Sequence, residues 1–371
     1  MVDFAAQRYA LIALAAAALF GASTPFSKLL LGEASPQMLG GLLYLGSGLG
    51  LSLIWVARFL SMRTSRRSSS RSLSRITLAQ LRQSELPWLA GAVLCGGILA
   101  PVLLLWGLSG ISAASASLLL NAEAVLTTLL AALFFAEHVG RRIWLASMLM
   151  LIAGGFLSWS PGGSGLSGMA LTTHVMAVVA ACLLWAVDNN LTRHVAAADA
   201  VTIALIKGLV AGSVNLALSL AAGAAMPSLA PLAGALVLGA TGYGASLALY
   251  VVALRNLGTA RTGAHFATAP FFGAVLAIAM GEPVTSLFAL ALALMVLATW
   301  LVLTESHQHP HQHAPLRHAH THVHDEHHHH SHDALDDAAV MPERGHVHEH
   351  EHAPLTHAHT HMPDLHHRHR H

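Results

Sequence analysis

The chain has 371 residues, of which 54% are hydrophobic and only 10% are charged, and its mean hydropathy is +0.58. Soluble globular proteins carry about 25% charged residues, so this composition excludes an ordinary water-soluble globule. The formal net charge of +1 conceals an uneven distribution of basic residues along the chain.

Ten apolar runs follow one another along the chain, each of roughly the 20 residues that a helix needs to cross about 30 Å of hydrocarbon. The strands of a membrane barrel would instead alternate in polarity over about ten residues, and these runs do not. We therefore predict an all-α polytopic membrane protein. The predicted spans are 9–31, 38–60, 86–108, 113–136, 143–160, 174–193, 200–222, 230–254, 259–280 and 286–303.

Basic residues between Met1 and Thr304 gather in one class of loop. If the N-terminus is inside, the outer loops contain no Lys or Arg; these loops are 32–37, 109–112, 161–173, 223–229 and 281–285. The positive-inside rule then predicts that both termini are cytoplasmic. No aromatic residue is interleaved among the arginines of the inner segment 63–85, so we expect a solvated loop and no nucleic-acid partner.

The two halves of the chain are similar to each other. Phe20–Lys28 aligns with Trp185–Arg193 at a shift of 165, and Leu108–Ala116 aligns with Leu254–Thr262 at a shift of 146. Five spans per half is an odd number, so the halves are expected to insert in opposite orientations. Inverted repeats are typical of secondary carriers, whose halves rock around a central site. The predicted domains are two inverted five-helix repeats and a tail, at 1–160, 161–304 and 305–371.

Several short motifs carry a resemblance to a known family. They are Phe20–Lys28, Ile111–Leu119 and Ala136-Glu137 in the first half, and Ala269–Ala274 and Gly281-Glu282-Pro283 in the second. On these motifs, residues 8 to about 303 resemble EamA-type transporters of the drug/metabolite transporter superfamily. The resemblance implies ten helices around a central cavity and transport of small metabolites. One departure is Glu123-Ala124, where the family often has Glu-Pro.

Polar and aromatic residues inside the spans are the candidates for a substrate site. Ionisable groups in hydrocarbon are costly and usually face a cavity or a partner. The candidates for the substrate cavity are Pro25, Lys28, Trp106, Asn121, Glu123, Asp188, Asn189, Tyr250 and His265.

The chemistry of these candidates leaves alternatives open. Lys28 either extends to the membrane interface or binds an anionic substrate group, and Pro25 can kink or break its helix and expose backbone groups to a ligand. Glu123 and Asp188 could each carry a proton, bind a cation or neutralise Lys28 or Lys207. Our hypothesis is that both acids line the cavity and that at least one titrates during transport.

The remaining candidates have a structural alternative as well. His265, the histidine lying well inside a span, is either a hydrogen-bonded packing residue or a ligand. Trp106 and Tyr250 either reach the cavity or pack within the bundle. For Glu137 and Glu282, which end helices, the family resemblance favours capping or pairing with basic loops.

Motifs of catalysis and nucleotide hydrolysis are missing from the membrane-spanning part of the sequence. Residues 1–304 contain no GxSxG, no GxxxxGK[ST] and no HExxH. We therefore predict a transporter driven by a gradient and not an enzyme, with no required cofactor.

The tail is crowded with histidine. From His307 onward it holds 24 of the 28 histidines, and a ten-residue unit occurs twice, at His313–His322 and His352–His361. With few apolar residues the tail cannot bury a core, so we expect it to be disordered. Imidazole suits Zn, Ni, Cu and Co, and His-rich tracts are typical of metal binding. The candidate ligands are His318, His320, His322, His324, His327, His328, His329, His330, His357, His359 and His361.

Three functions fit these observations. The leading hypothesis is a secondary carrier that exports a small organic metabolite, amino acid or drug-like compound, with a tail that buffers or senses metal; the tail could also respond to pH, be inert, or deliver metal to the pore. The alternatives are a transition-metal (Zn/Ni/Co) exporter and a non-transporting membrane metal sensor. The expected partners are the bilayer, a small solute and transition-metal ions, and a homodimer is left open. The expected location is a prokaryotic inner membrane.

Overall fold

The computed structural model describes residues 4–64, 83–135, 141–158, 166–195, 200–304, 307–313, 316–322, 346–352 and 355–361. It divides into two compact units, Met1–Glu305 and Ser306–His371, and each is described by itself. Within the described residues the first unit has ten helices that are long and apolar enough to cross a membrane. This confirms the predicted all-α polytopic fold.

The first half of the membrane unit follows the predicted spans, with two irregularities. Its third span joins η2, α3, η3 and α4 in one line, and its fourth is divided into α5 and α6. The bounds are α1 (Phe4–Leu30), α2 (Pro36–Thr64), η2 (Gln83–Glu85), α3 (Leu86–Ala92), η3 (Val93–Leu99), α4 (Ala100–Gly110), α5 (Ala113–Leu119), α6 (Ala122–Phe135) and α7 (Arg141–Ser158).

The second half repeats this plan. Its third span joins α10, η5 and α11, and its fourth is divided into α12 and α13. The bounds are α8 (Leu166–Thr192), η4 (Arg193–Val195), α9 (Ala200–Ala221), α10 (Leu229–Leu238), η5 (Gly239–Ala245), α11 (Ser246–Leu257), α12 (Thr259–Phe266), α13 (Ala269–Ala279) and α14 (Ser286–Leu303).

Both irregularities recur in the second half, the π-helical turns at the shift of 146 and the helix gaps at a shift of 147. The π-helical turns η3 and η5 occupy residues 93–99 and 239–245, and the gaps in the fourth helices lie at 120–121 and 267–268. π-Helical turns are rare and are often found at functional sites. Their recurrence, like the helix gaps, agrees with a two-halved organisation; the opposite orientation of the halves stays a prediction.

The break considered at Pro25 does not occur, because α1 runs through this residue to Leu30. Proline lacks the N–H that would bond the carbonyl of Gly21 four residues earlier. That carbonyl lies against Gly273 of α13, where a Cβ would come within 2.6 Å of the oxygen. The close approach of α13 covers the freed carbonyl, so a continuous helix is tolerated.

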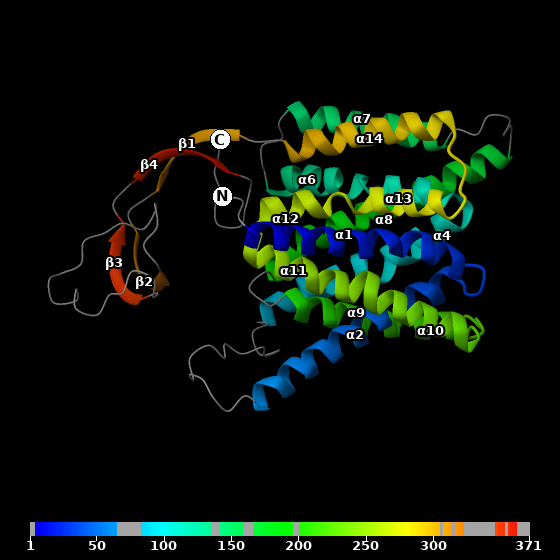
Figure 1. Cartoon of the computed structure of the whole chain (residues 1–371), viewed down its shortest axis with the longest axis horizontal. Coiled ribbons are helices and arrows are strands. Elements are labelled where there is room, and N and C mark those ends of the chain that lie inside the picture. The colour runs from blue at the N-terminus through cyan, green and yellow to red at the C-terminus, as the bar shows by residue number, and fades with distance from the viewer. Residues whose placement is uncertain are drawn as a thin grey trace. The chain divides into compact units, whose positions relative to one another are not determined.

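Helices from different halves pack side by side along the bundle. The most extensive contacts are α2 with α9 and with η5, α7 with α14, and α4 with α8, followed by α1 with α11 and α13. Figure 1 shows α7 running beside α14. Where α2 crosses α9, glycines leave no room for larger residues. A Cβ on Gly208 would lie only 2.7 Å from the backbone nitrogen of Gly48. Small residues allow such close backbone contact in membrane helices.

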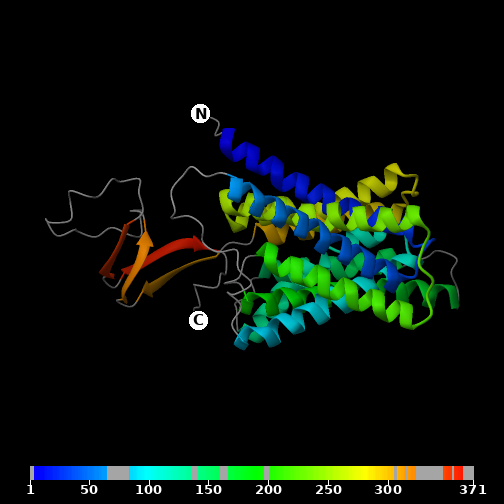
Figure 2. The ribbon, with the colours of Figure 1, turned by 90° about the horizontal axis from the view of Figure 1, so that it is seen from below.

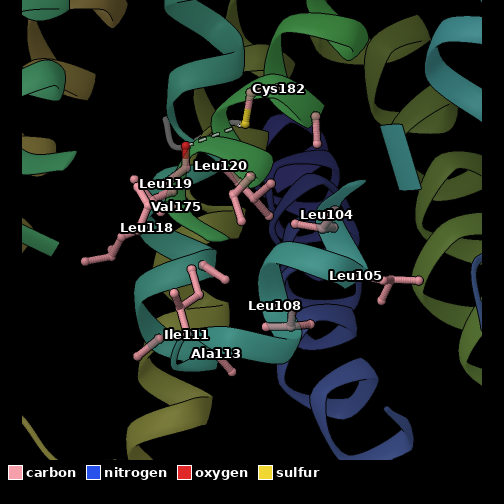
Figure 3. Close-up of a cluster of buried hydrophobic side chains, with 14 of the residues drawn as sticks. Leu104, Leu105, Leu108, Ile111, Ala113, Leu118, Leu119, Leu120, Val175 and Cys182 are labelled. Atoms are coloured by element: carbon pink, nitrogen blue, oxygen red, sulfur yellow. Dashed lines mark hydrogen bonds between the residues drawn. The ribbon is translucent and has the colours of Figure 1, made fainter. Parts of the chain in front are cut away.

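The largest apolar core lies where α4, α5 and α8 meet. Leu105, Leu108 and Leu118 are fully buried there. Figure 3 shows Leu118 on the same side of the view as Val175 of α8, and Leu105 and Leu108 on the other side. The Cys182 thiol donates to the carbonyl of Leu119 at 3.7 Å. This core fixes the end of α5 against α8, next to the gap that precedes α6.

The tail unit contains strands in the residues described. They are β1 (His307–His313), β2 (Leu316–His322), β3 (His346–His352) and β4 (Leu355–His361); β1 pairs antiparallel with β4 and β2 with β3. Figure 2 shows the strands of this unit as arrows. The expectation from composition that the tail is disordered stays a prediction. The His-x-His alternation has the period of two that a strand requires, and backbone pairing needs no apolar core.

Candidate functional site

A polar contact between α6 and α8 follows directly after the gap in the fourth span. Glu123 stands in the first turn of α6, and its Oε1 accepts a hydrogen bond from Asn189 Nδ2 at 2.9 Å. The same amide nitrogen lies 3.3 Å from Thr127 Oγ1. Asn190 Nδ2 donates to the carbonyls of Thr127 at 3.2 Å and Ala186 at 2.8 Å. We call Glu123, Thr127, Asn189 and Asn190 the polar seam.

One residue before Asn189, α8 carries the acid of a buried ion pair. Lys207 Nζ of α9 lies 2.6 Å from Asp188 Oδ1 and 2.5 Å from Oδ2. Thr192 Oγ1 donates to Oδ1 at 3.0 Å, and Asp188 is only 4% exposed. Of the roles considered for Asp188, the structure supports neutralisation of Lys207.

Gly96 in η3 lets α8 approach closely at this point. A Cβ on Gly96 would overlap the carboxyl group of Asp188. Its carbonyl accepts from Tyr44 Oη at 2.7 Å and from Trp185 Nε1 at 2.9 Å. A π-helical turn alters the regular backbone pairing, so this carbonyl is available to side chains of α2 and α8.

The ion pair and the polar seam form one electrostatic site. Glu123 interacts electrostatically with both Asp188 and Lys207, and Tyr44 interacts with both acids. Lys207 contacts both carboxylate oxygens of Asp188. The hydrogen-bond partner described for Glu123 is the neutral amide of Asn189. With both carboxylates ionised, these three groups therefore carry a net charge of −1.

Half-buried aromatic rings continue from this site towards α1 and α12. The ring centroids of Tyr44 and Tyr243 are 5.7 Å apart, those of Tyr243 and Phe20 also 5.7 Å, and those of Phe20 and Phe266 5.5 Å. Tyr250 follows at 4.9 Å from Phe266. We call these five residues the aromatic chain; it places the candidate Tyr250 at the end remote from Tyr44.

Lys28 is engaged away from the polar seam. Its Nζ donates to the carbonyls of Leu108 at 2.6 Å, Ile111 at 2.9 Å and Ser109 at 3.2 Å, which caps the C-terminal end of α4. Glu282 accepts from the backbone nitrogens of Ala113 and Ala114, both at 2.7 Å, and caps the N-terminus of α5. The two charges thus hold the 109–112 turn from either side.

Three other candidates also lie apart from the seam or make structural contacts. Asn121, in the helix gap, accepts from Thr299 Oγ1 of α14 at 3.2 Å. His265 Nδ1 contacts the carbonyl of Arg261 in its own helix at 2.6 Å. Trp106 packs on His174 with 4.9 Å between ring centroids and lines a cavity of about 480 Å³ with Gln37 and other residues of α2, α4 and α9.

Some candidates fall where little or nothing is described. Glu137, His324 and the four-histidine run 327–330 lie outside the described residues. The other tail candidates belong to strands, with His318, His320 and His322 in β2 and His357, His359 and His361 in β4. Among the residues described, no group of three or more His, Cys, Asp or Glu side chains is arranged to hold a metal ion.

Four residues of the site escaped the sequence analysis: Tyr44, Gly96, Thr127 and Trp185. One signal was available, for Gly96. The shift of 165 pairs Asp188 with Ser23, and the shift of 146 pairs Gly96 with Gly242; in the structure a Cβ on Gly242 would lie 3.0 Å from Ser23 Cβ. Gly96 of η3 therefore lies against Asp188, and Gly242 of η5 lies against Ser23, the equivalent residue of the other half.

Comparison with known proteins gives matches to a family model, to a curated relative and to solved structures. The EamA-like transporter family model matches residues 7–159 and 172–304. An uncharacterized transporter of Methanothermobacter thermautotrophicus is 28% identical over 271 residues, which cover 71% of this chain and 77% of that protein. A crystal structure superimposes with a TM-score of 0.55 at 18% identity, covering 79% of this chain and 95% of the other. At that identity, the crystal structure supports the fold alone.

Proposed function

Because the chain belongs to the EamA-like transporter family, we propose that it is a gradient-driven carrier that moves a small organic solute across the membrane by alternating access. The family and the related transporter support a membrane transporter of the drug/metabolite type. In this proposal the two halves insert in opposite orientations and rock about the region between them.

One observation carries the assignment of the substrate site. An acid, Glu123, stands at the start of a helix that follows a gap inside the membrane-spanning bundle, and it meets the amide of Asn189 there. Discontinuous helices that bring polar groups together near the middle of the membrane are typical of carrier binding sites. Ionisable residues at such depth are functional candidates by default.

Glu123 is also our proposed coupling residue. An isolated carboxylate in an apolar surrounding is unfavourable, so it tends to be neutralised by a proton or a cation. The charged and titratable groups around it are Asp188, Lys207, Tyr44 and Cys182. Asp188 already has a lysine partner, which leaves Glu123 as the acid whose occupancy can change during transport.

The test is solute flux in liposomes containing the purified full chain, measured for a panel of small metabolites under an imposed pH gradient. We expect at least one solute to move saturably, and Glu123→Gln to reduce that flux at least tenfold and flatten its pH dependence. Glu33→Gln, at an exposed acid in the α1–α2 turn, is the matched control. Unchanged flux and pH dependence in Glu123→Gln would reject Glu123 as the coupling residue.

We propose in addition that the tail binds transition metals. The strand register pairs His307, His309 and His311 with His361, His359 and His357, and β2 and β3 form three His–His pairs in the same way. The register therefore sets histidines of one strand opposite histidines of its partner in each two-stranded sheet. Imidazoles grouped in this way suit Zn, Ni, Co or Cu.

Metal content measured on the full chain tests this proposal. After equilibration with Zn or Ni and removal of free ion, we expect metal bound to the full chain and a large loss after truncation at Thr304. A second variant replaces the histidines of β2 and β4 by asparagine. Equal metal content in all three proteins would contradict a metal-binding tail.

The two alternative functions receive no comparable support. A metal exporter needs a metal site on its translocation path, and no three-ligand group exists among the described residues. A sensor that moves no solute would leave the site around Glu123 without a role. Location in a prokaryotic inner membrane with cytoplasmic termini remains a proposal, which reporter fusions at both ends would test.

A further inference from the structure

The charges of the site indicate which class of solute it accepts. Resting on the transport function proposed above, we propose that the substrate is an organic monocation whose positive group binds at Glu123 and whose apolar body lies along Tyr44 and the aromatic chain.

The first step is the count of charges. Glu123 and Asp188 contribute two negative charges and Lys207 one positive charge, and these three groups interact electrostatically. Lys207 is held by both oxygens of Asp188. The site is therefore one positive charge short of neutrality, and a monocation restores it.

The second step concerns the acceptors that a cation would meet. The described hydrogen bond of Glu123 uses only Oε1, so Oε2 remains an acceptor among the contacts described. Glu123 is half-buried and Asn189 is exposed, so the acid is reachable from one side of the seam. A cation here would gain a carboxylate partner in a region where unpaired charge is strongly disfavoured.

The third step is the aromatic surface next to this charge. Tyr44 interacts electrostatically with Glu123 and is 5.7 Å from Tyr243 between ring centroids. The ring of Tyr243 leads on to Phe20 at 5.7 Å, and all three are half-buried. Aromatic faces attract organic cations, and such rings are used to recognise quaternary ammonium groups.

The bases argue against an anion or a zwitterion at the same site. The carboxylate of an amino acid would have to compete with Asp188 for Lys207. The ammonium group of the other lysine, Lys28, donates hydrogen bonds to three backbone carbonyls. Neither described lysine therefore offers an unused cationic partner for an anionic substrate group.

Flux in liposomes with three probes of similar size tests the charge preference. The probes are phenyltrimethylammonium, a permanent cation; L-phenylalanine, a zwitterion; and 3-phenylpropionate, an anion. We expect saturable flux of the cation at least tenfold above that of the other two. Glu123→Gln should remove it, Glu123→Asp should retain part of it, and Glu33→Gln should stay within twofold of the unmodified chain.

A charge-restoring pair separates the charge count from simple structural damage. Asp188→Asn leaves Lys207 to neutralise Glu123, so cation flux should fall at least tenfold. Adding Lys207→Met returns the net charge to −1, and flux should rise at least threefold above that of Asp188→Asn. Equal flux in the single and double variants would overturn the charge argument.

The outcomes distinguish this inference from the transport function on which it rests. If phenylalanine or phenylpropionate moves in a Glu123-dependent way and the cation does not, transport stands and the cation inference is overturned. If none of the three probes nor any solute of the wider panel moves, the transport function fails and the inference fails with it.

Discussion

The two halves of the bundle solve the same packing problem in different ways. In one seam α1 meets α13 through Gly21 and Gly273, and a Cβ on Gly21 would overlap the carbonyl of Ala269. The corresponding seam joins α8 to α6, where the shifts of 165 and 146 place Ala186 and Thr127. The glycines allow α1 and α13 to pack in direct backbone contact. The side chains between α6 and α8 leave room for Glu123 and Asn189. The polar residues therefore lie at the α6–α8 contact and not at the equivalent α1–α13 contact.

The largest expected effect sharpens this comparison at the π-helical turns. Gly96→Ala would drive a methyl group into the Asp188 carboxylate, whereas Gly242→Ala would meet Ser23 Cβ at 3.0 Å, a contact that a small shift relieves. Overpacking costs about 1–3 kcal/mol and at times more, so we expect Gly96→Ala to lower the thermal unfolding temperature far more than Gly242→Ala. Gly155→Ala, in open space on α7, is the control and should be neutral or stabilising.

A somewhat smaller effect is expected at the seams themselves. Gly21→Ala should destabilise the bundle by about 1–3 kcal/mol because the methyl group has no room against α13. Thr127→Val in the polar seam keeps the side-chain shape and should cost about 1 kcal/mol through the lost hydrogen bond to Asn189. Denaturant unfolding of both variants measures the difference. A larger loss in Thr127→Val would mean that the seams are equally tight and that the comparison is mistaken.

The caps of the 109–112 turn should give the next effect. Glu282→Gln weakens two charge-assisted bonds to backbone nitrogens, and hydrogen bonds to charged groups contribute about 1.5–3 kcal/mol each. Since glutamine retains one acceptor oxygen, we expect a loss of about 1–2 kcal/mol in unfolding free energy. Lys28→Met removes three donors and should act in the same range. Wild-type stability in both variants would contradict their role as caps.

Truncation after Thr304 should have the smallest effect on the bundle. The tail is a separate unit by its contacts, so solute flux and the unfolding temperature of the membrane unit should change little. A loss of flux on truncation, in the absence of any metal, would show that the tail belongs to the transport cycle.

The sequence predicted the ten spans and the duplication because both depend on local patterns, namely apolar length and repeated motifs. It also identified Glu123, Asp188 and Asn189, since acids and amides are rare in such spans. It could not decide between Lys28 and Lys207 as the partner of Asp188, and it did not predict that Lys28 would cap α4. Those pairings depend on which helices become neighbours, and no local pattern records that.

The irregular helices illustrate the same limit. Pro25 was the visible helix breaker, yet α1 continues through it, and the gaps lie at 120–121 and 267–268 instead. No proline occupies those gaps; Asn121 and Thr268 hold local backbone carbonyls there through their side chains. The π-helical turns contain several glycines in each half, but glycine alone does not distinguish a π-helical turn from close helix packing.

The cap formed by Glu282 has a consequence for rates. Glu282 belongs to the second half and the amides it binds, at Ala113 and Ala114, belong to the first. Any motion that draws the α13–α14 turn away from α5 must therefore break two charge-assisted bonds before new ones form. At about 1.5 kcal/mol each, their rupture adds about 3 kcal/mol to the barrier, which slows separation at this end of the bundle by roughly a hundredfold.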